Sequence, residues 1–190
     1  MYSSIFSIEV AGRLDRAPNL LPILRSAITE QPHVIGLHHK WQLYRRASEA
    51  LLDHIGIIER GCWDYFDDHE RAEKDFKMWL GGMTTEEGAR PFPSGRPDPY
   101  RGEPRYFTFT MTFLLVRPSP TDDAMRRLCD IPQTHLWRRD VFARLLSGMG
   151  VINFASVKSD VMYLIPRDDD WGLTVDDLAH QKFHYLRVLQ

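Results

Sequence analysis

The chain has 190 residues, of which 43% are hydrophobic, and this is enough for one substantial core. Its formal net charge of -2 argues against a nucleic-acid partner, because the chain carries no broad positive field. The longest nearly apolar run, 107–116, is too short to span a bilayer and the start shows no signal-peptide pattern, so we expect a soluble, cytoplasmic protein without membrane contact.

The first part of the chain, 1–80, is predicted to form one strand followed by helices. Apolar and polar residues alternate over 6–10, which is the period of a strand with one wet face. Apolar residues at helical spacing then predict one helix over 20–28 and a second over 41–54. A third helix is expected to carry an apolar stripe of Tyr65, Ala72, Phe76 and Trp79.

The stretch 81–105 differs in composition from both of its neighbours, since it holds five prolines and five glycines. This predicts an irregular or polyproline-like connector between 1–80 and 106–190, which can still belong to one compact domain. Long loops of this kind often carry function, and this one has aromatic and arginine side chains that could anchor a partner. The interaction residues expected in it are Phe92, Arg96, Tyr100 and Arg101.

The C-terminal half opens with a strand of strict two-residue period. Its apolar face predicts that Phe109, Met111 and Phe113 lie in the core. Thr108 and Thr110 fall on the other face, which we expect to be a docking surface for a protein.

The remaining elements complete the predicted fold. Thr121 is expected to cap a helix, another helix is expected over 137–147 and ends at glycine, and a strand is expected to end near Pro166. The order of elements predicts an α+β protein: an N-terminal strand and helical layer, then a β-α-α-β-α-β unit. We expect one antiparallel or mixed sheet with helices on one side.

The closing stretch, 167–190, contains five aspartates and two histidines. They could form half of a metal or hydrolytic site, or simply a turn and a capped helix. Three of the aspartates, 168–170, follow a strand as a polar turn would, and Thr174 precedes Asp177 at capping-box spacing. The two histidines share a face only if a helix continues past both, whereas the last residues favour a strand. The structural interpretation is therefore preferred.

The same stretch resembles the C-terminal signature of an uncharacterised family of bacteria, cyanobacteria and chloroplasts, catalogued as domain of unknown function 1517. That signature is a strand ending in proline, an acidic turn, Leu-Thr, an acidic pair, and a closing Leu-Arg. The matching residues are Pro166, Leu173, Thr174, Asp177, Leu178, Phe183, Leu186, Arg187 and Leu189. The family has no established catalytic residues, so the resemblance implies none here.

A second acidic cluster offers an alternative function. The run "DYFDDHE" supplies oxygen and imidazole ligands of the kind that metal ions use, and two histidines of a predicted loop could add to them. The residues of this metal-dependent hydrolase hypothesis are Asp64, Asp67, Asp68 and His69, with His38 and His39. The same acids would also suit the first turn of a helix.

The function favoured by the sequence is non-enzymatic. No phosphate-binding loop, nucleophile elbow or metalloprotease motif occurs, and no catalytic residue or cofactor is indicated. Cys62 and Cys129 make no paired motif and suit free thiols in a reducing compartment. The chain is interpreted as an interaction, adaptor or assembly module with a protein partner or with itself.

Overall fold

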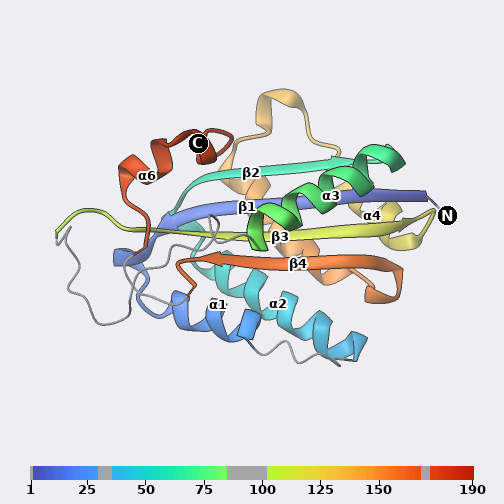
Figure 1. Ribbon diagram of the computed structural model, residues 1–190, viewed down its shortest axis with the longest axis horizontal. Helices are drawn as coiled ribbons and strands as arrows, with labels where there is room; N and C mark the ends of the chain where they lie inside the picture. The colour runs from blue at the N-terminus through green and yellow to red at the C-terminus, as the bar shows by residue number, and fades with distance from the viewer. Residues whose placement is uncertain (1, 30–35, 85–101, 168–171) are drawn as a thin grey trace.

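The structure, a computed structural model, describes residues 2–29, 36–84, 102–167 and 172–190. Within them lie six helices and one five-stranded antiparallel sheet of order β4-β3-β1-β2-β5 (Figure 1). The strands are β1 (Tyr2–Arg13), β2 (Ile58–Phe66), β3 (Tyr106–Arg117), β4 (Val157–Ile165) and β5 (Arg187–Val188). The helices are α1 (Leu20–Thr29), α2 (Leu37–Asp53), α3 (His69–Thr84), α4 (Pro120–Leu128), α5 (Arg139–Ser147) and α6 (Val175–Ala179). The predicted α+β class is confirmed, as is the β-α-α-β-α-β order of the second half.

Both halves of the chain contribute to the one sheet. The first half runs β1, two helices, then β2 beside β1, and the second runs β3, two helices, then β4 beside β3. The halves meet where β1 and β3 pair over their whole length, from Tyr2 opposite Arg117 to Arg13 opposite Tyr106. The middle of the sheet therefore consists of one strand from each half.

One face of the sheet carries the main core. Phe109, Met111 and Phe113 are buried there, as predicted, beside the even-numbered apolar residues of β1. Helices α1, α2, α4 and α5 supply the opposing apolar side chains, among them Tyr44 and Phe142. This packing follows from the two-residue period of the strands, which directs every second side chain toward the same helices.

The opposite face is covered at both ends, so the prediction of helices on one side only is wrong. Helix α3 lies across the front of the sheet in Figure 1, where Ala72 and Phe76 pack on Ile5 and Leu114. At the other end of the strands, the segment 172–190 packs on the same face. Ala72, Phe76 and Trp79 of the predicted stripe do lie on the inward face of α3, but this face packs on the side of the sheet that carries the threonines.

Two local predictions also need correction. Tyr65 belongs to β2 rather than to the third helix, because 58–66 pairs with β1 in an antiparallel ladder and α3 begins only at His69. The N-cap of α4 is Ser119, whose hydroxyl accepts a hydrogen bond from the backbone N–H of Asp122 at 3.1 Å, so Thr121 lies inside the helix. A proline at the first helical position favours this earlier start.

The C-terminal segment is held at both of its ends. Leu173 exchanges two backbone hydrogen bonds with Tyr106, and Gly172 makes the approach possible, since a Cβ there would lie 2.6 Å from the Tyr106 carbonyl oxygen. The predicted capping box of α6 is confirmed: Thr174 Oγ1 accepts from the Asp177 N–H at 3.1 Å, and the Asp177 carboxylate accepts from the Thr174 N–H at 2.8 Å. The last strand, β5, is shorter than expected and consists only of Arg187–Val188.

Candidate functional site

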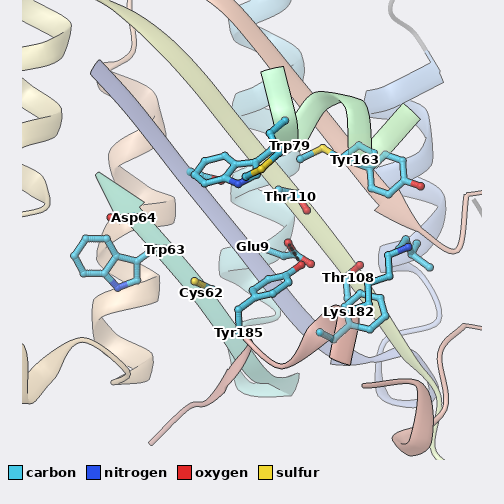
Figure 2. Close-up of a pocket in the computed structure, with 16 residues that line it drawn as sticks. Glu9, Cys62, Trp63, Asp64, Trp79, Thr108, Thr110, Tyr163, Lys182 and Tyr185 are labelled. Atoms are coloured by element: carbon cyan, nitrogen blue, oxygen red, sulfur yellow. Dashed lines mark hydrogen bonds between the residues drawn. The ribbon is translucent and has the colours of Figure 1, made fainter. Parts of the chain in front are cut away.

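A pocket of about 470 Å³ opens on the second sheet face, between α3 and the C-terminal segment (Figure 2). The two coverings leave the middle of β1 and β3 without a helix above it. The floor is made by strand residues, and the walls by the end of α3 on one side and by residues 182–185 on the other. The pocket is therefore a direct result of covering one sheet face with two short, separate elements.

The floor is one cross-strand row of side chains. Tyr163 of β4 lies opposite Thr110 of β3, Thr110 opposite Glu9 of β1, and Glu9 opposite Cys62 of β2. Paired residues in a sheet point to the same side, so all four face the pocket. Ser7, in the adjacent row, also lines the pocket, and its hydroxyl shares a 2.7 Å hydrogen bond with that of Thr112.

Glu9 is the ionisable group at the centre of this floor. The hydroxyl of Tyr185 donates a 2.9 Å hydrogen bond to its carboxylate. Figure 2 shows the two side chains next to each other. Burial raises the pKa of Glu9 to about 7, and the hydrogen bonds from Tyr185 and Thr110 and the charge of Lys182 only partly oppose this. A carboxyl with such a pKa exchanges its proton near neutrality, which is characteristic of functional sites.

The pocket walls are largely apolar. Helix α3 contributes Met78, Trp79 and Met83, and the C-terminal segment contributes Phe183 and the ring of Tyr185. Glycine at position 82 leaves open space at the mouth, since a Cβ built there meets nothing within 4 Å. An ionisable floor under apolar walls is the usual composition of a small-molecule site.

The thiol beside Glu9 is not an activated nucleophile. Burial, and after it the negative charges of Glu9 and Asp64, raise the pKa of Cys62 to about 11. Burial likewise raises the pKa of Cys129 to about 12. Both cysteines are free thiols, and both stay protonated at neutral pH.

The interaction residues predicted from the sequence have different outcomes. Thr108 and Thr110 are buried rather than open, at 1% and 4% exposure, because α3 and the C-terminal segment cover their face. They line the pocket instead of a flat docking surface. The other four, Phe92, Arg96, Tyr100 and Arg101, lie outside the described residues.

The acids of the metal hypothesis are not brought together. Asp67 forms a 2.7 Å ion pair with Arg117, and Asp68 accepts from the Arg71 N–H at the start of α3. His69 Nδ1 accepts from the backbone of Ser3, and Asp64 lines the pocket. The loop histidines His38 and His39 begin α2, and across the described part of the chain no three ligand side chains form a metal-binding group.

The sequence interpretation missed Glu9, Tyr185 and Lys182 altogether. Glu9 was assigned to a wet strand face, and that assignment gave no reason to single out one acid. Tyr185 lies 176 positions away along the chain, and only the docking of the C-terminal segment brings its hydroxyl to Glu9. One signal was available: Glu9 is the single charged residue in an otherwise uncharged run, 2–12.

Comparison of the chain with protein-family models, with curated proteins and with solved structures finds no match. The resemblance to domain of unknown function 1517 therefore stays a prediction. Among the helices that the structure describes, none has the length and apolar character needed to cross a membrane.

Proposed function

We propose that the protein is a binding module for a small, largely apolar molecule that makes one polar contact with Glu9. The observation that carries this proposal is the ionisable carboxyl on the floor of the pocket, beneath apolar walls. A cavity of about 470 Å³ lies in the usual size range of ligand sites. Two free cysteines fit a reducing compartment, and we include a cytoplasmic location in the proposal.

The position of Glu9 supports a binding role over a structural one. Glu9 is half-buried, and partial removal of a carboxyl from water costs free energy. The hydrogen bonds from Tyr185 and Thr110 do not cancel this effect, so the pKa of Glu9 stays raised. A threonine or valine in β1 would fill the same position without that cost. A group kept at an energetic disadvantage in a pocket is best explained by what it contacts there.

The protein-interaction hypothesis is a second proposal, favoured by the mouth of the same pocket. Met78, at 60% exposure, and Tyr185 lie at this mouth and would suit an apolar side chain of a partner or of a second copy. Light scattering tests self-association. A dimer that becomes monomeric with Met78→Glu would support it, and a monomer at every concentration would contradict self-association here.

The small-molecule proposal is tested with a neutral probe, naphthylethanol, titrated into the purified protein. We expect saturable binding that Gly82→Trp weakens about tenfold or more, because the new indole occupies the pocket. Gly81→Trp is the matched control, since position 81 is equally open but does not line the pocket. Equal loss of binding in both variants would remove the proposal, and so would a failure of both naphthylethanol and its charged analogues to bind.

A further inference from the structure

The charges that line the pocket are unbalanced. Glu9 and Asp64 both line it, whereas among the described lining residues Lys182 is the one cation. Lys182 is exposed, and its ammonium lies 5.9 Å from the centre of the Phe183 ring. Its charge is the weakest of the influences that lower the pKa of Glu9. The pocket therefore presents more acid than base to a ligand.

The two acids line the same pocket from adjacent strands. Glu9 lies opposite Cys62, and Asp64 lies two residues further along β2, opposite Ser7. Side chains two apart on a strand point to the same face, and diagonal neighbours on adjacent strands are roughly 7 Å apart. An ammonium has three hydrogen-bond donors, so it can donate to Glu9 and still be attracted by Asp64.

Aromatic rings border the same space. Among them are Trp79 from α3, Tyr163 from β4, and Phe183 and Tyr185 from the C-terminal segment. Figure 2 shows Trp79 and Tyr185 on two sides of Glu9. The faces of such rings attract cations, and the attraction is strongest where water is excluded.

We propose that the pocket selects an organic cation, a protonated amine on an apolar body, with its ammonium held by Glu9 and its body against Trp79 and the C-terminal rings. This inference rests on the proposed binding function and specifies its ligand class. The acids supply the charge recognition, and the rings and methionines accept the rest of the molecule.

Binding of a cation should change the protonation of Glu9. Burial raises the pKa of Glu9 to about 7. Burial also raises the pKa of Asp64, and the positive charge of Arg71 partly opposes that rise. The titratable and polar groups that line the pocket around Glu9 include Cys62 and Asp64 of β2, Thr110 of β3, Tyr163 of β4, and Lys182 and Tyr185 of the C-terminal segment. Of these, Tyr185, Thr110 and Lys182 lower the pKa of Glu9. An ammonium beside Glu9 favours the carboxylate, so binding near pH 7 releases part of a proton.

The experiment compares three probes of similar shape on the whole protein: naphthylethylamine, naphthylethanol and naphthylacetate. Isothermal titration calorimetry gives their affinities at about pH 6 and pH 8, and repetition in buffers of different ionisation enthalpy gives the protons released. We expect the amine to bind about tenfold more tightly than the alcohol at pH 8, with less preference at pH 6 because Glu9 is then protonated.

Two variants test which acid causes the preference for the amine. Glu9→Gln keeps the shape of the side chain and should abolish both the amine preference and the proton release, and Asp64→Asn should reduce the preference. Glu49→Gln is the control, since it removes the same charge from an exposed position of α2, on the other side of the sheet.

Each outcome decides one of the two proposals. Equal binding of amine and alcohol, both weakened by Gly82→Trp, would overturn the cation inference and retain the binding pocket. Tightest binding of naphthylacetate would overturn it in favour of an anion held at Lys182. Failure of all three probes to bind would overturn the proposed function itself. Proton release by the wild-type protein needs no variant, so it is informative even if Glu9→Gln does not fold.

Discussion

Glu9 lies between two core residues, Ile8 and Val10, yet its carboxyl points to the other face of the central strand. The strand period forces this contrast, because neighbouring side chains in β1 serve opposite faces. Replacement of Glu9 therefore alters the pocket while leaving the main core unchanged. The effect of the Glu9 charge can therefore be measured through the free energy of unfolding.

The stability of the protein should depend on pH through Glu9. In the unfolded chain this carboxyl titrates near 4.5, and in the folded protein at about 7. Between these values the folded state binds more protons, so its free energy of unfolding falls as pH rises. The gain in free energy of unfolding of Glu9→Gln over the wild type should therefore be about 1–3 kcal/mol larger at pH 8 than at pH 5. Urea unfolding at both pH values measures this, with Glu49→Gln expected to show no such difference.

Core packing gives a second prediction at the same scale. Phe109 is fully buried between the sheet and its helices, so Phe109→Ala should lower the free energy of unfolding by about 3–5 kcal/mol. Leu37→Ala, at an exposed position of α2, should change it by roughly 0.5 kcal/mol or less. Denaturant unfolding of both variants is the measurement, and similar costs for the two would place Phe109 outside the core.

At the scale of elements, the C-terminal segment is a wall of the pocket rather than an appendage. Its capping box fixes where α6 begins, and Phe183 and Leu186 pack on the strand residues Ala11 and Ile165. Tyr185 lies between these two anchors in sequence and turns its hydroxyl toward Glu9. The cap and these two anchors thus belong to the same segment that brings Tyr185 to the pocket.

Weakening this cap should loosen the pocket. Thr174→Ala removes the hydroxyl that accepts from the Asp177 N–H and should cost about 1 kcal/mol of stability. We also expect amide hydrogen exchange to quicken between 175 and 186, and naphthylethanol to bind more weakly. Val175→Ala, at an exposed position in the same helix, is the control. Unchanged exchange in Thr174→Ala would show that Tyr106 and Gly172 hold the segment without the cap.

The elements show how far the sequence could lead. The period of β3 predicted its core face, and the Thr174–Asp177 spacing predicted the capping box, because each is encoded within a few neighbouring residues. Strand β2 was not predicted, since its polar and apolar residues share no simple alternation and its assignment depends on pairing with β1. The pocket could not be predicted for the same reason, because it joins residues 9, 62, 110, 163 and 185, which are distant along the chain.

At the scale of the whole molecule, the two halves depend on each other. Each supplies one of the two central strands, so a separated half would expose a full strand edge and half of the main core. The composition of the connector divides the sequence into two halves that can form one compact domain, and the hydrogen-bonded sheet joins these halves. Both halves also contribute to the pocket floor.

This dependence predicts the behaviour of fragments. Residues 1–84 and 102–190, produced separately, should each lack a cooperative unfolding transition, because neither can bury its central strand alone. Co-expression should restore a complex that unfolds cooperatively, as judged by circular dichroism of the co-purified pair. A cooperative transition in either fragment by itself would contradict the prediction.

The position of Tyr185 also determines when the pocket is completed during synthesis of the chain. A ribosome makes the strands of the floor first and 173–190 last among the described residues, so the sheet can assemble while its pocket still lacks a wall. A ligand that needs both Glu9 and the C-terminal rings can bind only after this segment has docked. Such a ligand would hold the segment in place and would distinguish chains in which this segment has docked from chains in which it has not.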